Sequence, residues 1–487
     1  MKSRFSFVVG LVLGLTITNR FYDPYLTTNL LRETSVSTVD RHDSSGLKIS
    51  DTGMGEVDTP DVSTTTSSST SSKTTLIDGG AVDADSSTAK ATNLSPKFDL
   101  KNDEDEGISG CLIIKDDNSR LIEWIAYHYT VLPMKTLVAA VDHTSKTSPN
   151  EILRRWNNTF MEVYSWNFTE FIYPEYLGPN STMEQRTRQQ FFHEACFNFL
   201  KKKNKKWVTA VDTDEYVTFN RFTETDLPAH QATRDATLAK AANGTAPLTR
   251  QEEMILARTR IPPIDDPTTV WEFMQQEKNN PPWNTEGCVT MTRLMLGARE
   301  NPWITQNIQA TLPNALNATK LDTLRFFQHR AKGICKRNCK GKALLEVSRI
   351  PDEHLLHPVT LRKQYEQRQE PVPTKLPPLS PLGPHTPVLE CRNDEIPNYL
   401  TSILRVQHYL GSEEAFFARK DYRGANRDKK FNWYRNLSSR PELEATHWVT
   451  HFIQKVGGVE QAAALLDGAG EVQFWKQQKL LAAAAAT

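Results

Sequence analysis

Short apolar runs alternate with amphipathic stretches in the part of the chain that follows residue 107. Residues 111–114, 137–141 and 207–211 are continuous apolar runs, which is typical of strands buried on both faces of a sheet. Residues 120–131, between the first two runs, carry apolar side chains at helical spacing. A strand, a helix and a strand within about thirty residues form a βαβ unit. The pattern therefore predicts an α/β fold with a mostly parallel sheet flanked by helices.

The rest of the chain gives a coarser pattern. Strands are predicted at residues 288–296, 324–327 and 343–347, and helical spacing recurs at 191–200, 270–276, 413–419 and 447–481. Residues 220–284 are rich in Thr, Ala and Pro, which indicates an insertion or a mobile loop. Residues 366–388 are rich in Pro and predict an extended connector.

The N-terminus has the pattern of a targeting segment. Lys2 and Arg4 precede a mostly apolar stretch, residues 5–18, that is shorter than the ~20 residues of a typical membrane span. Because no small-x-small cleavage site follows, we interpret residues 1–32 as an uncleaved signal-anchor segment, with a cleaved signal peptide as the alternative. Residues 33–106 are rich in Ser, Thr, Asp and Gly, which predicts a disordered stem.

Composition narrows the class of partner and the compartment. Basic and acidic residues each number 58, so the net charge is zero and no basic field favours nucleic acid. The six cysteines fit two or three disulfides in a luminal domain. Cys335 and Cys339 are the tightest pair, for which zinc binding with His329 is the alternative to a disulfide or free thiols. Glycosylation sequons at Asn93, Asn157, Asn167, Asn180, Asn243, Asn317 and Asn436 agree with a luminal chain.

Three carboxylates follow the apolar run at 207–211 within four residues. Asp212, Asp214 and Glu215 come directly after this predicted strand, and Asp142 follows the run at 137–141. Because ligands bind at the carboxyl ends of strands in open α/β sheets, we expect Asp142 and Asp212 to share one edge of the sheet. Closely spaced carboxylates repel each other and favour a hard divalent cation such as Mg²⁺ or Mn²⁺. The alternative is that Asp212 and Asp214 only cap a turn.

Several stretches together resemble glycosyltransferase family 92 and its family 2-like relatives. The opening motif is matched by residues 110–116, 123–124 and 127–129, and residues 207–216 are similar to the family's tryptophan-led strand that ends in Asp-x-Asp-Glu and an aromatic. Residues 325–330, 341–343 and His357 follow in the family's order, and residues 405–409 with 412–414 are similar to its closing His-Tyr motif.

The resemblance covers about residues 107–420, which we interpret as the glycosyltransferase domain, with residues 421–487 as a helical C-terminal extension. Residues 142–146 depart from the acidic, Gly- and Ser-rich turn of the family. Residues 220–284 and 366–388 look like additions, so the acceptor specificity of the family does not carry over.

The resemblance implies a GT-A type fold and a metal-assisted, inverting transfer of a sugar from a nucleotide-sugar donor to a glycan acceptor. A UDP-hexose is the expected donor, with galactose as a guess from the family. The resemblance assigns Asp214 as a direct ligand of Mn²⁺ or Mg²⁺ and Asp212 as a contact to the metal or the ribose. His408 would complete the metal shell, unless it is a core histidine beside Tyr409, and His357 is the second candidate.

The nucleotide and the catalytic base are less sharply assigned. Lys115 and Asp142 are candidate contacts to the nucleotide, with ordinary turn residues as the alternative. An inverting transfer needs a carboxylate base near the acceptor hydroxyl. Glu215, Glu286 and Glu300 are candidates for this base, and spacing does not choose among them.

Two other functions compete with glycosyl transfer. A metal-dependent hydrolase would use the same acids to activate water, and a membrane-tethered carbohydrate-binding protein would keep the fold without the activity. The anchor and the resemblance together favour a single-pass type II protein of the Golgi or another secretory membrane, with its catalytic domain in the lumen.

Overall fold

The computed structural model describes residues 107–172, 185–222, 228–244, 246–297, 299–328, 341–372, 387–392, 399–418 and 441–470. The predicted anchor and stem lie outside the described residues, as do His329, Cys335 and Cys339. No helix in the described ranges is long and apolar enough to cross a membrane.

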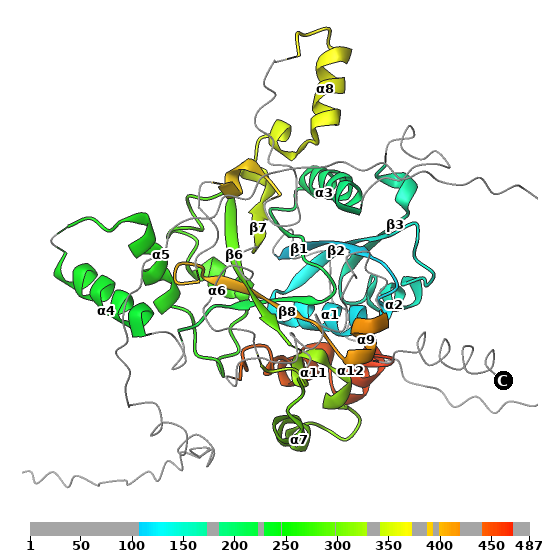
Figure 1. The fold of residues 1–487 in the computed structure, drawn as a ribbon, viewed down its shortest axis with the longest axis vertical. Coiled ribbons are helices and arrows are strands. Elements are labelled where there is room, and N and C mark those ends of the chain that lie inside the picture. The colour runs from blue at the N-terminus through cyan, green and yellow to red at the C-terminus, as the bar shows by residue number, and fades with distance from the viewer. Residues whose placement is uncertain are drawn as a thin grey trace, which may run out of the picture. The chain divides into compact units, whose positions relative to one another are not determined.

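A curled sheet of eight strands, covered by helices on its two faces, forms the centre of the fold (Figure 1). The strands are β1 Ile108–Ile114, β2 Met134–Val141, β3 Glu162–Trp166, β4 Trp207–Thr209, β5 Glu215–Phe219, β6 Cys288–Leu296, β7 Lys342–Glu346 and β8 Leu404–Tyr409. The helices are α1 Asn118–Val131, α2 Asn150–Trp156, α3 Gln185–Lys202, α4 Pro228–Asn243, α5 Arg250–Thr259, α6 Val270–Gln276, α7 Pro302–Thr311, α8 Pro358–Gln367, α9 Glu413–Ala418, α11 Trp448–Val456 and α12 Val459–Leu466.

The strand order is β3-β2-β1-β4-β7-β6-β8-β5. The first four strands are mutually parallel, β7 is antiparallel to both β4 and β6, β6 is parallel to β8, and β5 is antiparallel to β8. The sheet is therefore mixed, because β7 and β5 run against the other six strands. Residues 288–291 of β6 pair with β7 whereas residues 292–296 pair with β8, so β6 joins the two parts of the curled sheet.

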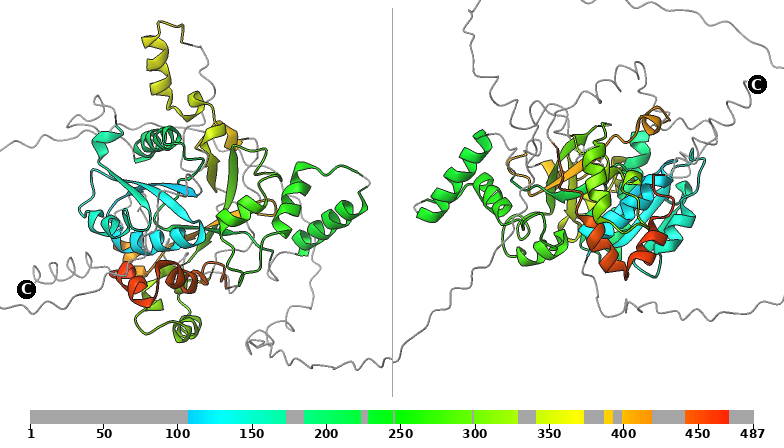
Figure 2. Two further views of the ribbon diagram at one scale, coloured as in Figure 1. Left: turned by 180° about the vertical axis from the view of Figure 1, so that it is seen from behind. Right: turned by 90° about the horizontal axis from the view of Figure 1, so that it is seen from below.

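Two hydrophobic clusters cover the two faces of the sheet, as the continuous apolar strands predicted. Along β1, Leu112 and Ile114 belong to the cluster that includes α1, whereas Cys111 belongs to the cluster that includes α3. This is the period-two alternation of a strand that is buried on both faces. Helices α11 and α12 pack on α1, as both views of Figure 2 show, and belong to its cluster.

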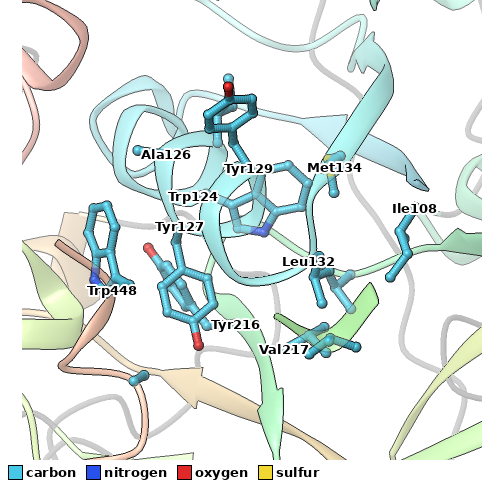
Figure 3. Packing of buried hydrophobic residues seen from close by; sticks show 14 of the residues in the cluster. Ile108, Trp124, Ala126, Tyr127, Tyr129, Leu132, Met134, Tyr216, Val217 and Trp448 are labelled. Carbon is cyan, nitrogen blue, oxygen red and sulfur yellow. The ribbon is translucent and has the colours of Figure 1, made fainter. Parts of the chain in front are cut away.

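Aromatic side chains dominate the contact between α1 and the sheet (Figure 3). Tyr127 meets the ring of Tyr216 edge-on at 5.1 Å between centroids, and meets Trp448 of α11 at 5.8 Å. Fully burying one such side chain stabilises the fold by roughly 1.5–3 kcal/mol. Helix α1 is thereby fixed against β5.

Two disulfides connect the helices and loops to the sheet. Cys111 of β1 is bonded to Cys196 of α3, and Cys288 at the start of β6 is bonded to Cys391. Two of the predicted two or three bridges are therefore present among the described residues, although the sequence did not indicate which cysteines pair.

Several predicted elements have the expected positions, and others were wrong. The strand predicted at 324–327 is wrong, because a 3₁₀ turn, Asp322–Leu324, occupies its start. Within residues 220–284, which were predicted as an insertion or a mobile loop, the helix predicted at 270–276 is confirmed as α6, whereas α4 and α5 were not predicted. Capping boxes at Thr249 with Glu252 and at Thr269 with Glu272 start α5 and α6, and the Thr- and Pro-rich composition obscured the first of these signals.

The predicted C-terminal helical pattern, residues 447–481, forms two helices within the described residues. Gly457 and Gly458 separate α11 from α12, with φ angles of +94° and +128°. Glycine adopts these angles without the clash that a Cβ would cause. The remainder of the pattern, residues 471–481, lies outside the described residues.

We expect the stability of the fold to depend on the neutral form of His128. Its side chain is 0% exposed, its Nδ1 lies 2.8 Å from the carbonyl oxygen of Trp124, and its Nε2 accepts a hydrogen bond of 3.2 Å from the amide of Val217. Burial lowers the pKa of His128 to about 3, so its stabilising contribution is full above its ordinary pKa of 6.5 and decreases as pH falls below it.

Urea unfolding at pH 7 and pH 5 tests this dependence. Wild type is expected to lose about 2 kcal/mol more than a His128→Gln variant between the two pH values, because only wild type must keep a neutral imidazole at position 128. Other titrating groups are common to both proteins, so equal pH dependence of the two unfolding free energies would contradict the prediction.

Candidate functional site

The predicted acids lie at one edge of the sheet. Asp142 follows the end of β2, and Asp212 lies between the end of β4 and the start of β5. Because β7 runs in the opposite direction, its first residue, Lys342, reaches the same edge, and so does His408 near the end of β8. The topology thus brings residues from distant parts of the chain to the carboxyl ends of the parallel strands, as the sequence predicted for Asp142 and Asp212.

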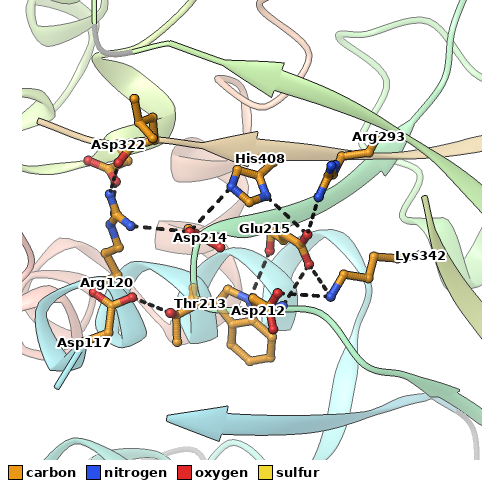
Figure 4. A network of polar contacts seen from close by, with 12 residues as sticks. Asp117, Arg120, Asp212, Thr213, Asp214, Glu215, Arg293, Asp322, Lys342 and His408 are labelled. Atoms are coloured by element: carbon orange, nitrogen blue, oxygen red, sulfur yellow. Dashed lines mark hydrogen bonds and ion pairs between the residues drawn. The ribbon is translucent and has the colours of Figure 1, made fainter. Parts of the chain in front are cut away.

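Glu215 closes the turn that carries the acids (Figure 4). The amide of Asp212 donates a 3.0 Å hydrogen bond to Oε2 of Glu215, and the amide of Glu215 donates a 2.9 Å bond to the carbonyl oxygen of Asp212. The hydroxyl of Thr213 donates to the carboxylate of Asp117 in front of α1. The side chain that closes the turn is therefore that of Glu215, whereas Asp212 takes part through its backbone.

Glu215 is a buried carboxylate that needs a compensating charge. Its side chain is 0% exposed, and Nζ of Lys342, a residue that is 1% exposed, lies 2.8 Å from its Oε2 and 3.1 Å from Oδ2 of Asp212. Burial alone would raise the pKa of Glu215, but the charge of Lys342 and the contact with His408 hold this pKa well below its ordinary value. Glu215 is therefore ionised, and Lys342 neutralises it.

The ionised Glu215 fixes the orientation of His408. Nδ1 of His408 lies 3.2 Å from Oε1 of Glu215, and because an ionised carboxylate can only accept, this nitrogen carries the proton. Nε2 then points to Oδ2 of Asp214 at 3.6 Å, which is longer than a hydrogen bond. Histidines that bind metal ions in proteins usually donate the N–H of their other ring nitrogen to a carboxylate, as His408 does to Glu215.

Asp214 is buried beside both positive and negative groups. Its residue is 8% exposed, and burial raises its pKa to about 6 although His408 and Arg120 oppose this rise. Burial alone would lower the pKa of His408, but the carboxylates of Asp214 and Glu215 raise it above its ordinary value. Asp214 and His408 therefore each favour the charged form of the other.

Oδ2 of Asp214 and Nε2 of His408 are the candidate donor atoms for a divalent cation at this edge. Adjacent ligands of an octahedral Mg²⁺ lie about 3 Å apart, and these two atoms are 3.6 Å apart, so a bound ion would draw them together. Among the described residues, no group of three or more His, Cys, Asp or Glu side chains is arranged to hold a metal ion. Two protein ligands are nevertheless a common number for Mg²⁺, which takes its remaining ligands from water and substrate phosphates.

The remaining predicted site residues lie in three places. Lys115 is exposed beyond β1, and Asp142 accepts a 3.2 Å hydrogen bond from Nε of Arg188 on α3. Burial would raise the pKa of Asp142, but hydrogen bonds from Thr144 and the charges of Arg188 and Lys115 hold it below its ordinary value. His357 caps α8 and packs on Phe191, so its ring is engaged outside the pair of Asp214 and His408.

The three carboxylates considered as the base differ in their surroundings. Glu215 is fully buried, and Glu286 precedes β6 at the end opposite to the acids, where it pairs with Arg250 at 2.6 Å. Glu300 is exposed beyond the other end of β6 and pairs with Arg325. Glu286 therefore lies away from the acidic edge, and Glu215 lies at this edge but is not accessible to a substrate.

Three basic residues of the site were missed by the sequence reasoning. Lys342 was noted only as part of the motif at 341–343, and Arg120 only as part of the predicted helix at 120–131. Arg293 lies in β6, with its Nη1 3.9 Å from Oε1 of Glu215. The signal that could have found Lys342 is its polar character at the start of an otherwise apolar run, residues 343–345. A charge at such a position requires a buried partner.

We expect Lys342→Met to destabilise the fold strongly. Removing the ammonium leaves the buried carboxylate of Glu215 without its compensating charge, which costs about 3–5 kcal/mol in comparable pairs. Urea unfolding of Lys342→Met, Glu215→Gln and the double variant measures the coupling, and the double variant is expected to lose less than the sum of the single losses. Arg154→Met, which breaks an exposed pair with Glu151, is the control, and an equally small loss for Lys342→Met would refute the prediction.

Comparisons with known proteins add little to this geometry. No family model and no curated protein matches the chain. The structure of Staphylococcus aureus TarS 1–349, a glycosyltransferase, is similar over 77% of this chain and 92% of that chain, with 10% identity and a TM-score of 0.23. A likeness at this TM-score carries no argument about fold or function, so the likeness to glycosyltransferase family 92 stays a resemblance of sequence motifs.

Proposed function

We propose that this protein is a glycosyltransferase that moves a sugar from a nucleotide-sugar donor to a glycan acceptor. The observation that carries the proposal is the pair of Asp214 Oδ2 and His408 Nε2, 3.6 Å apart at the carboxyl edge of the sheet. The motifs at residues 110–116, 207–216 and 405–409, which resemble glycosyltransferase family 92, support the same function.

A divalent cation, Mn²⁺ or Mg²⁺, is part of the proposal. Asp214 and His408 would hold it, and it would supply positive charge to the leaving diphosphate. Asp212 has a 42% exposed side chain whose Oδ2 is engaged by Lys342, so its contact to a ribose hydroxyl fits better than direct ligation. Glu215 orients His408 and is not required to contact the substrate.

The nucleotide would lie over the ends of β1 and β2. Lys115 offers an exposed ammonium there, and Asp142 offers an ionised carboxylate that Arg188 holds in place. A carboxylate accepts hydrogen bonds from base or ribose donors, and an ammonium compensates phosphate charge. The exposed Lys115 and the ionised Asp142 support the proposal of a nucleotide site at the ends of β1 and β2.

Among the candidate bases, the exposed Glu300 is favoured. A base for an acceptor hydroxyl must be reachable by the acceptor, which Glu215 is not. Glu286 lies at the other end of β6. Glu300 follows the end of β6 at which Met295 pairs with His408, so the chain leaves the sheet towards Glu300 at the edge that carries the candidate cation pair.

The proposed location is the lumen of the Golgi or another secretory compartment. The disulfides Cys111–Cys196 and Cys288–Cys391 support it, because disulfides persist in oxidising compartments. A type II anchor, a UDP-hexose donor and a glycan acceptor on a glycoprotein or polysaccharide complete the proposal.

Thermal unfolding of the full-length protein with a panel of nucleotide sugars tests the function. A true donor is expected to raise Tm with increasing concentration and to do so only with Mn²⁺ or Mg²⁺ present, because ligands of the native state stabilise it by mass action. Asp214→Asn is expected to fold, to lose this shift and to lower the transfer rate at least about 100-fold.

Asp235→Asn, on the exposed surface of α4, is the matched control and should leave both readouts unchanged. Unchanged transfer in a folded Asp214→Asn variant would exclude the site. Donor saturation without transfer to any acceptor would favour a carbohydrate-binding protein, and release of free sugar without an acceptor would favour a hydrolase.

A further inference from the structure

A single buried arginine joins the candidate cation pair to two other segments of the chain. Arg120, in the first turn of α1, is 6% exposed. Its Nη2 donates a 2.8 Å hydrogen bond to the carbonyl oxygen of Leu410. Its Nε lies 3.0 Å from Oδ2 of Asp322, and its Nη1 lies 3.8 Å from Oδ2 of Asp214 (Figure 4). The oxygen of Asp214 that Arg120 faces is the one that faces His408.

The chain makes room for this guanidinium with a glycine. Gly411 has a φ of +81°, and a Cβ at this position would lie 1.7 Å from Nη2 of Arg120. Every residue other than glycine would therefore displace the guanidinium, in addition to the strain of a left-handed backbone. Gly411 directly follows the residue whose carbonyl oxygen Arg120 binds, and it lies three residues after His408.

Helix α1 holds the segment that contains Asp322 and Thr323 through two of its side chains. Glu123, one turn after Arg120, accepts hydrogen bonds from the amides of Asp322 at 2.7 Å and of Thr323 at 2.9 Å. The 3₁₀ turn that begins at Asp322 is therefore held through its backbone by Glu123 and through the Asp322 carboxylate by Arg120. This double attachment keeps Asp322 beside Arg120, so the guanidinium has one orientation and faces Asp214 from a fixed position.

Arg120 cannot itself be a ligand contact in this arrangement. Its Nη1 is enclosed by protein atoms and has no hydrogen-bond partner, although an arginine nitrogen normally finds one. Its attraction to Asp214 is the interaction left for this nitrogen. An arginine that is buried this deeply acts on the site through its neighbours.

We propose that Arg120 is a positioning residue, which holds the carboxylate of Asp214 opposite Nε2 of His408 and which requires glycine at position 411. The inference rests on the proposed function for its catalytic meaning, but the positioning itself is a property of the protein alone. Arg120 is absent from the set of residues that the motif resemblance assigned to the site.

The test compares Arg120→Lys and Gly411→Ala with wild type and with Arg154→Lys, an exposed arginine on α2. Crystal structures of the folded proteins give the distance from Asp214 Oδ2 to His408 Nε2. Transfer kinetics with a nucleotide-sugar donor give kcat and KM. Both site variants are expected to change the distance by more than about 1 Å and to lower kcat/KM at least about 10-fold, because lysine cannot span three acceptors and alanine displaces the guanidinium.

The two readouts separate the positioning role from the proposed function. An unchanged distance in a folded Gly411→Ala or Arg120→Lys protein would overturn the inference, whatever the kinetics. A changed distance in a protein for which wild type neither binds donor nor transfers sugar would support the positioning role and refute the glycosyltransferase. If Arg120→Lys does not fold, Gly411→Ala decides alone, since it keeps every charged group of the site.

Discussion

The structure at the acidic edge depends on burying the charge of Glu215. Its carboxylate has no access to water, so it must be matched by Lys342 and by hydrogen bonds. Once it is matched, its two oxygens serve different neighbours: one closes the turn through the amide of Asp212, and the other receives Nδ1 of His408. A buried ion pair often contributes little net stability, but it can fix one arrangement among several. Here it fixes which nitrogen of His408 faces Asp214.

The site is built from parts of the chain that only the tertiary fold brings together. Asp214 comes from the turn after β4, His408 from β8 and Lys342 from the reversed strand β7. A reversed strand inside an otherwise parallel arrangement brings its first residue to the edge where its neighbours end. The mixed character of the sheet is thus the reason that a lysine can reach the carboxylates.

The sequence carried local information well and long-range information poorly. The continuous apolar runs predicted β1, β2 and β4, because strands buried on both faces leave such a signature, and the coarser pattern also predicted β6 and β7. The acids at residues 212–215 were identified because three carboxylates after such a run are unusual. By contrast, the roles of Arg120 and Lys342 depend on partners roughly 90 to 290 positions away in the sequence, and the helices α4 and α5 lay in a segment whose Thr and Pro content suggested a loop. No pattern within a short window records such partners.

Strand β6 is shared by the two parts of the sheet, and this has an evolutionary consequence. Its first half is committed to β7 and its second half to β8, so a change of register in β6 would shift both neighbours at once. Lys115 and Asp142, by contrast, lie at the ends of strands that do not pair with β6. Selection can therefore alter the surroundings of Lys115 and Asp142 while the pair of Asp214 and His408 is retained, and we expect β6 to diverge more slowly than β2 or β3 as such chains drift apart.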